Sequence, residues 1–544
     1  MPLKKSLSIT FIILIVIIVF FQIKHIGDFQ LDDSYITFSF SKNLAAGNGP
    51  IYSHGLRVEG YSNFLWMVLV SIPIKIWPQA DIYFLARMLM IPFVILLFWS
   101  TFQLAKNFTS FFFSLSALLL LALSSDIFSA AIVALETIPY TALLTTAFFL
   151  YTKDHNDRRI IPLITVAALM RIDGVIPLGL LCFFELLYLI GTKQFSLKKY
   201  IQWAAPGLIV YAIWFAWRWW YYGLLFPTTY YAKSHIHEAL PNRGYEYSWS
   251  AFKSCGGLAL LPICAFYIFK KPNYKTLWLS LFTLIHITYV IHVGGDWMPF
   301  ERFFIPLFPI IFTLFIVGIQ EILKSISHFP SILRAPYYVG LASIYAFVMI
   351  WLNNYSINTP EEQTKANFVL DKTNNIQSTL MPSAKFFAPI FQPGEKLVHD
   401  YTGVFAVFTD AQIIDMWGLC NKDVALHGTT TGINPIYGLT CPACFARENP
   451  DFFLTMTLPK PFESFKDHYS VISNVWQGDQ IGRYLDFRND YVTGKITDTR
   501  KHLIGYFLER RKPEKTFQTR YPTPDIKIEY PFLTENSQPH DSQN

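Results

Sequence analysis

Long apolar runs alternate with short polar segments over roughly the first two thirds of the chain. The first run covers about residues 7–23, follows Lys4 and Lys5, and is about as long as one bilayer crossing requires. Further apolar runs cover residues 61–77, 82–104, 111–123, 127–151, 160–190, 201–222, 256–269, 277–293, 303–319 and 337–352. Because some runs are longer than one span, the pattern predicts roughly 11 to 13 transmembrane helices at about 20 residues each.

The charges between these runs predict an orientation. The short basic segments 153–159, 193–199 and 270–275 favour the cytoplasmic side. The acidic pair Asp32 and Asp33 then lies outside, with the polar breaks at residues 134–140, 171–174, 221–234 and 294–302. The first run lacks a following cleavage site with small residues, so we interpret it as a retained helix.

Composition supports a multi-pass membrane protein. The chain is 52% hydrophobic and 15% charged, whereas soluble domains carry about 25% charged residues. The net charge of +6 is small for 544 residues, and basic residues do not gather with aromatic ones as in nucleic-acid-binding proteins. No nucleotide-binding loop or hydrolase motif is present.

The composition changes near residue 353. Residues 1–352 form the predicted transmembrane domain, and the polar residues 353–544 predict an extracytoplasmic α/β domain with short strands in 395–408 and 411–419. The tail from about residue 523 is predicted to be disordered. Cys441 and Cys444 have no further ligands at zinc spacing and no thioredoxin-like surroundings, which favours a structural disulfide.

Asp32 and Asp33 are the sharpest chemical signal. They lie in the predicted outer loop 24–60, where the chain leaves the bilayer, and a carboxylate near hydrocarbon is costly unless it serves a function. Adjacent residues do not share a helix face, so one can act while the other orients a partner. A carboxylate can take a proton from a hydroxyl group or hold a cation. Alternatively, Asp33 caps a short interfacial helix that ends at Gly47.

Other charged residues on the predicted outer face have two interpretations each. Arg57 and Glu59 form an interfacial salt bridge or contact a sugar or phosphate. Lys233 snorkels in an aromatic belt or meets a lipid phosphate. Asp296 caps a turn or belongs to the donor site, and Arg302 is a candidate phosphate clamp.

A second group of candidates has a supporting role. Glu136, Arg171 and Asp173 stand at helix breaks, where they contribute to the acceptor site or Arg171 and Asp173 neutralise each other. His399 and Asp400 form a loop pair in the C-terminal domain or part of the acceptor site.

These segments, in this order, resemble the polytopic glycosyltransferases of the GT-C class that use polyprenyl-phosphate sugars. The closest resemblance is to the terminal β-(1→2)-arabinofuranosyltransferases of bacterial cell envelopes. It lies in six stretches between residues 31 and 425: LDDSYITFSFSKNLAAGNGPIYSHGLRVEGYSNFLW, ALET, RIDG, YYGLLFPTTYYAK, GGDWMPFERFFIPLFP and VHDYTGVFAVF…IIDMWGLCNKDVA. The family pattern often has Pro and Glu in place of Ile172 and Asp173, and Gly in the segment of His399, which leaves the sugar and acceptor open.

The resemblance implies an enzyme that transfers a sugar, such as a pentofuranose, from polyprenyl phosphate to an envelope glycan. Asp32 or Asp33 would be the catalytic carboxylate, and Lys233, Arg302 and Arg57 would hold the lipid phosphate. The site would face the outside of a bacterial inner membrane. No cofactor is required by the sequence, although Mg²⁺ or Mn²⁺ is compatible with it.

Two alternatives remain open from the sequence. The same fold could glycosylate a protein or lipid A, so the acceptor is a glycan, a lipopolysaccharide or a glycoprotein. A transporter or flippase would instead predict ionisable residues at mid-membrane and inverted repeats. The charges cluster at one face and no internal repeat is visible, which disfavours transport.

Overall fold

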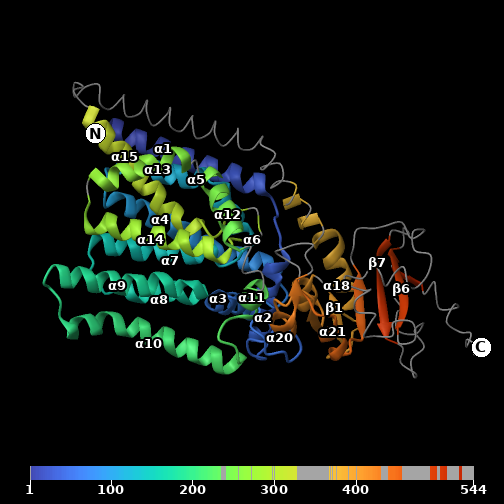
Figure 1. Cartoon of the computed structure of the whole chain (residues 1–544). Helices are drawn as coiled ribbons and strands as arrows, with labels where there is room; N and C mark the ends of the chain where they lie inside the picture. Colours follow the sequence, from blue (N-terminus) through green and yellow to red (C-terminus); the bar gives the residue numbers. More distant parts are fainter. Residues whose placement is uncertain are drawn as a thin grey trace, which may run out of the picture.

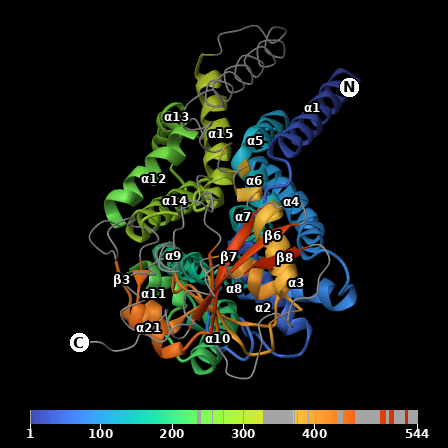
Figure 2. The same ribbon diagram turned by 90° about the vertical axis from the view of Figure 1, so that its right-hand side faces the viewer.

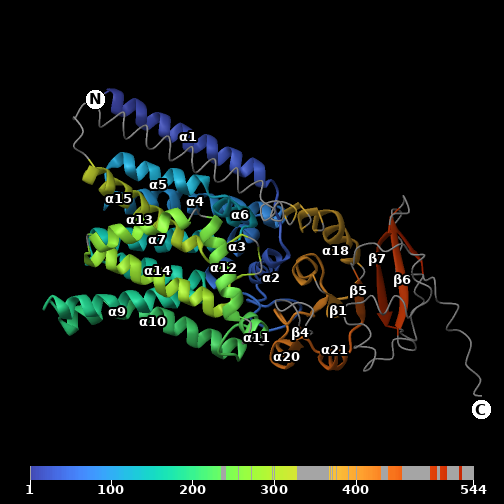
Figure 3. The ribbon, with the colours of Figure 1, turned by 45° about the horizontal axis from the view of Figure 1, so that its top comes forward.

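The computed structural model combines a bundle of helices with a mixed sheet at one end of it (Figure 1). It describes residues 2–234, 240–254, 257–270, 272–296, 298, 300–326, 367, 369–370, 372–374, 376–389, 391–399, 401–430, 439–455, 491–498, 503–510 and 526–529. The helix α1 (Pro2–Ile26) lies along one side of the bundle, and α9 (Val175–Gly191) and α10 (Leu197–Tyr222) lie on the opposite side (Figures 1 and 3).

The remaining helices of the bundle follow the apolar runs of the sequence. They are α3 (Phe64–Ile76), α4 (Ile82–Lys106), α5 (Phe111–Leu123), α6 (Ser125–Val133), α7 (Thr137–Lys153), α8 (Ile160–Met170), α12 (Leu240–Ser254), α13 (Gly257–Lys270), α14 (Tyr274–Val293) and α15 (Phe308–Ile326). One part of the core lies between α7, α9 and α14, where Trp278 is in ring contact with Phe148 and Phe184. Outward-facing apolar side chains such as Phe20, Ile95 and Ile213 are more than half exposed, as expected for a surface that faces lipid.

Within the described residues, five helices are long and apolar enough to cross a membrane, or six if the bent pair α5 and α6 forms one span. This count is lower than the roughly 11 to 13 spans expected from the apolar runs. One reason is that polar breaks cut two long runs into shorter helices: α6 from α7 at Glu136, and α8 from α9 at Asp173. The last predicted span, residues 337–352, lies outside the described residues.

The acidic pair opens the helix α2 (Asp32–Ala45). Leu31 occupies the N-cap position, so the alternative in which Asp33 caps this helix is wrong. Gly47 has φ of +86° just beyond the helix end, as the pattern predicted. Residues 34–41 of α2 are all buried, and the helix packs against α3 and the C-terminal region.

The C-terminal region contains a six-stranded sheet in the order β2-β1-β5-β7-β6-β8. Its strands are β1 (Lys396–His399), β2 (Gln412–Asp415), β5 (Phe452–Thr455), β6 (Tyr491–Asp498), β7 (Leu503–Arg510) and β8 (Ile526–Glu529). The strand β1 pairs in parallel with β2 and β5, whereas the pairs β5–β7, β7–β6 and β6–β8 are antiparallel. Figure 2 shows β6, β7 and β8 in front of the helices.

Two sequence expectations for this region need correction. Between the expected strands β1 and β2, residues 402–408 form the helix α19 (Thr402–Phe408) and not an extension of a strand. Residues 526–529 form β8, although the tail from about residue 523 was expected to be disordered. Ile526 and Ile528 alternate with charged residues, which is the period of a strand. The alternation covers only a few residues within a polar segment, so it is a weak signal in the sequence.

The structure contains the disulfide that the sequence favoured. Cys441 and Cys444 form a disulfide at the start of α21 (Pro442–Glu448). Cys182, Cys264 and Cys420 are buried free thiols. A two-stranded sheet of β3 (Thr429–Thr430) and β4 (Leu439–Thr440) and the helix α20 (Lys422–His427) complete this part of the chain.

Candidate active site

A cavity of about 270 Å³ lies where the helix bundle meets the C-terminal region. Its walls come from the start of α2, the chain before α3, the α6–α7 break, the α8–α9 break, α11 (Thr228–Ser234), the end of α14 and the segment before α15, with Leu419 from the C-terminal region. Asp33, Glu136, Arg171, Asp173, Lys233 and Arg302 all line it. The structure therefore brings together six of the twelve residues that the sequence singled out.

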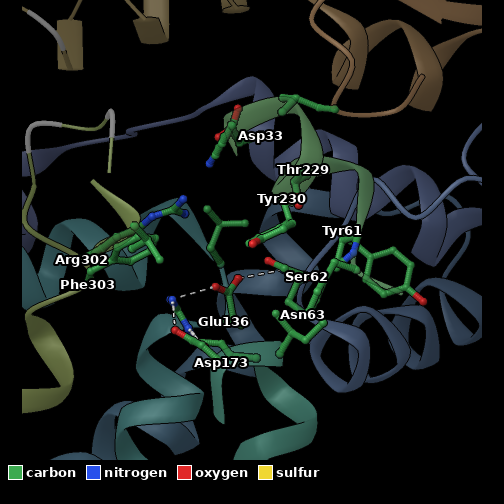
Figure 4. Close-up of a pocket in the computed structure, with 18 of the residues that line it drawn as sticks. Asp33, Tyr61, Ser62, Asn63, Glu136, Asp173, Thr229, Tyr230, Arg302 and Phe303 are labelled. Carbon is green, nitrogen blue, oxygen red and sulfur yellow. Dashed lines mark hydrogen bonds and ion pairs between the residues drawn. The ribbon is translucent and has the colours of Figure 1, made fainter. Parts of the chain in front are cut away.

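Hydrogen bonds to Val133 and Tyr83 fix the first turn of α2, which carries Asp33. The Ser34 hydroxyl donates to the carbonyl of Val133 at 2.8 Å. The Tyr83 hydroxyl accepts from the Leu31 amide at 3.1 Å and lies 3.1 Å from the same Val133 carbonyl, to which it donates. In Figure 4, Asp33 enters the cavity from α2, opposite the side chains at its base.

Ion pairs and hydrogen bonds order the base of the cavity. Arg171 donates in a fork to both carboxylate oxygens of Asp173, each at 2.9 Å, and contacts Glu136 at 3.3 Å. The second oxygen of Glu136 accepts from the Asn63 amide at 2.8 Å. One guanidinium against two carboxylates leaves this base with a formal charge of −1. Arg171 and Asp173 therefore neutralise each other, and both also line the cavity.

Two cationic side chains line another wall. Arg302 pairs with Asp296, which lies behind it. Desolvation lowers the pKa of Arg302, but the nearby carboxylates of Asp296, Glu136 and Asp33 outweigh it and raise the pKa overall. Desolvation lowers the pKa of Lys233, and Asp296 and Asp33 oppose this shift. Figure 4 shows the Arg302 guanidinium directed towards the space below Asp33.

Arg57 and Glu59 do not line the cavity. Glu59 forms a buried ion pair with Arg218 of α10, whose side chain is 0% exposed. Arg218 Nε lies 2.9 Å from Glu59 Oε1, and its Nη1 donates to the Leu225 carbonyl at 2.6 Å. Arg57 is exposed and stacks over the Tyr221 ring at 5.0 Å. The Glu59–Arg218 pair thus positions the segment that leads to Lys233, and no Arg57–Glu59 bridge forms among the ion pairs of the described residues.

Two further candidates, Asp32 and His399, do not line the cavity. Asp32 Oδ1 and Oδ2 accept from the amides of Val404 and Gly403 at 2.8 and 2.9 Å. His399 is the last residue of β1 and is buried, and its Nδ1 accepts from the Tyr401 amide at 2.7 Å. Asp400 lies outside the described residues.

The structure adds cavity residues that sequence reasoning did not single out. Asn63 and Thr37 are joined by a hydrogen bond of 3.1 Å from the Asn63 amide to the Thr37 hydroxyl. Tyr289 enters from α14, and Thr229 and Tyr230 from α11. The sequence signal was weak: uncharged polar residues beside an apolar run also occur at ordinary helix ends. Only their convergence in space distinguishes them.

Among the described residues, no group of three or more His, Cys, Asp or Glu side chains is placed to hold a metal ion. Asp33 faces Lys233 and Arg302 across the cavity, and these cations already supply positive charge. We therefore derive no step through a divalent cation.

Asp415 shapes the part of the C-terminal region that reaches the cavity. It is fully buried, and its carboxylate accepts from the amides of Trp417 and Cys420 at 2.8 and 2.6 Å. This turn places Leu419 in the cavity wall, where its carbonyl accepts from the Thr228 hydroxyl. Burial raises the pKa of Asp415 to about 6, and Asp33 adds to the shift.

A pH dependence of stability follows. Because the folded pKa is raised above the unfolded value near 4, the protonated form favours folding. Its contribution, at most about 3 kcal/mol for a shift of about two pH units, is full below about pH 4 and is lost as the pH rises through about 6. Because Asn stays neutral at every pH, we expect the apparent melting temperature of wild type relative to Asp415→Asn to fall from pH 4 to pH 7. A difference that stays constant over this range would contradict the assignment.

Comparisons with known proteins extend over most of the chain. A family model described as a domain of unknown function, DUF8728, matches residues 372–495. No curated protein matches the chain. The solved structure of ArnT from Cupriavidus metallidurans bound to undecaprenyl phosphate is similar with a TM-score of 0.49 and 11% identity, covering 82% of this chain and 93% of that chain.

A second solved structure is the archaeal oligosaccharyltransferase AglB from Archaeoglobus fulgidus in complex with an inhibitory peptide and a dolichol-phosphate. It has a TM-score of 0.48 and 11% identity, and the match covers 94% of this chain and 75% of that chain. The function proposed below rests on the residues of the cavity and on the sequence stretches that carry the resemblance.

Proposed function

We propose that this protein is a membrane glycosyltransferase that moves a sugar from a polyprenyl-phosphate donor to a hydroxyl group of an acceptor. One observation carries the proposal: a carboxylate, Asp33, and two cations, Lys233 and Arg302, line one cavity at the end of an apolar helix bundle. A donor with an apolar tail and an anionic head needs such a place, with apolar helices for the tail and cations for the phosphate.

Each group has a chemical role in this proposal. Asp33 takes the proton of the acceptor hydroxyl as its oxygen bonds to the anomeric carbon of the sugar. The bond between that carbon and the phosphate oxygen breaks, and its electron pair leaves with the lipid phosphate. Lys233 and Arg302 stabilise the negative charge that grows on this leaving group. The polar base with Glu136, Asp173 and Asn63 offers partners for sugar hydroxyls.

The sequence stretches that carry the resemblance support a finer proposal. The donor sugar is a pentofuranose such as arabinofuranose, the acceptor is an envelope glycan, and the cavity faces the outside of a bacterial inner membrane. Transfer to protein or to lipid A is the alternative with the same chemistry.

The test is sugar transfer by the purified full chain in lipid, with and without EDTA. Polyprenyl-phosphoryl-arabinofuranose is offered first, then other lipid-linked sugars, each with an arabinan-like glycan, a peptide or lipid A. Transfer of arabinofuranose to the glycan is the expected result, and EDTA should leave its rate unchanged. Transfer from another lipid-linked sugar only would retain the enzyme and reject arabinofuranose. No transfer with any pair, together with translocation of the lipid-linked sugar across proteoliposomes, would favour a flippase.

A further inference from the structure

The helix α19 of the C-terminal region packs against α2, the helix that begins with the acidic pair. At the start of both helices, Asp32 accepts the amides of Gly403 and Val404 at 2.9 and 2.8 Å. At their other ends, Lys42 Nζ donates to the Val407 carbonyl at 2.6 Å. An anion is favourable at the amino end of a helix, where N–H groups lack partners within the helix, and a cation is favourable at the carboxyl end, where C=O groups lack them. α2 therefore holds α19 at both ends.

Close backbone contact makes this packing specific. A Cβ atom at Gly403 would collide with the carbonyl oxygen of Asp32 and lie 2.7 Å from the Ile36 amide nitrogen and 3.0 Å from Tyr35 Cβ. Most of these are backbone atoms of α2, which cannot rotate away as a flexible side chain can. The Tyr52 hydroxyl adds a bond of 3.0 Å to the Thr402 carbonyl. Only a glycine at position 403 allows α19 to reach the first turn of α2.

The same turn of α2 carries Asp33 into the cavity. On its other side, Ser34 donates to the Val133 carbonyl at 2.8 Å. The first turn is therefore held between α19 and the end of α6, with Asp33 in the cavity wall. Both carboxylate oxygens of Asp32 accept backbone amides of α19. Asp32 is therefore directed towards α19, whereas Asp33 lines the cavity.

We infer that Asp32 is a positioning residue, and that docking of α19 on it through Gly403 sets the place of Asp33 in the cavity. The C-terminal region is then a working part of the catalytic site, in addition to any contact with the acceptor. This inference rests on the proposed function for its catalytic consequence, whereas the coupling between α19 and the first turn of α2 stands on geometry alone.

The most direct variant is Gly403→Ala, because it disturbs the packing of α19 on α2 and replaces no cavity residue and no charge. Gly179→Ala on α9 is the matched control, since a Cβ there meets no atom within 4 Å. Both are purified as full chains in lipid nanodiscs. We expect Gly403→Ala to lower kcat about 10-fold or more, because small misplacements of reacting groups are costly. The KM for the donor should stay within about two-fold, since the lysine and arginine of the cavity are unchanged.

Amide hydrogen exchange gives a readout that does not depend on activity. In Gly403→Ala, exchange should rise in residues 402–408 and also in residues 31–36, and neither should change in Gly179→Ala. If Gly403→Ala does not fold, Asp32→Ala replaces it with the same expectations.

The outcomes separate this inference from the proposed function. Faster exchange in residues 402–408 alone, with kcat retained, would overturn the inference. An unchanged exchange in both segments would do the same. Absence of transfer by wild type with every donor would reject the proposed function, and the coupled rise in exchange would still decide whether α19 positions the first turn of α2.

Discussion

Replacing Asp33 by Asn is expected to lower kcat for sugar transfer by at least about 100-fold, the usual range for loss of a general base. The Asn side chain has nearly the same size, but it cannot take the proton of the acceptor hydroxyl. Binding of the donor should change little, because Lys233 and Arg302 remain in the cavity. Initial rates with the lipid-linked donor, together with the apparent melting temperature in nanodiscs, measure both effects.

Asp28→Asn is the matched control. Asp28 stands five positions before Asp33 on the same side of the bundle, pairs with Arg87 and does not line the cavity. Its loss should change kcat by less than about two-fold, since no general base is removed. If Asp33→Asn keeps wild-type kcat, Asp33 is not the base, and the two other cavity carboxylates, Glu136 and Asp173, would be tested next.

The second large effect concerns stability. Arg218→Met leaves Glu59 as a buried carboxylate without its guanidinium partner, and breaking a buried ion pair in this way costs about 3–5 kcal/mol. Arg218 is 0% and Glu59 3% exposed, so water cannot replace the lost interactions in the folded protein. Burial already raises the pKa of Glu59 against the opposing effect of Arg218, so the variant will bind a proton there. The midpoint of denaturant unfolding in mild detergent measures the loss.

A double variant separates the ion pair from packing. Glu59→Gln combined with Arg218→Met removes both charges, and we expect it to recover much of the stability lost in Arg218→Met. The segment from residue 223 to Lys233 should then regain its place, and with it the affinity for the donor. If the double variant is as unstable as the sum of both single variants, the stabilisation comes from the shape of the arginine and not from its charge.

The sequence predicted the helical bundle because lipid and a closely packed interior both demand apolar side chains over the length of a helix. The bounds of α4 and α14 follow their apolar runs within a few residues at each end. The sequence also predicted features that depend on residues close together in the chain. These are the end of α2 at Gly47 and the disulfide between Cys441 and Cys444. By contrast, hydropathy does not show where a helix breaks inside the bundle, as between α6 and α7 and between α8 and α9.

The sequence by itself determined which residue types stand near the ends of the helices, since a charge beside an apolar run is visible without a structure. It selected Asp33, Arg171 and Arg302 as candidates, but it ranked Glu59 and Asp32 alongside them. Only the tertiary structure distinguished the cavity residues from the other two. Glu59 pairs with Arg218 and Asp32 accepts amides of α19, and each partner is more than 150 positions away in the sequence. The physical reason is that a carboxylate is used by whichever donor lies within hydrogen-bond reach, and that donor comes from a distant part of the chain.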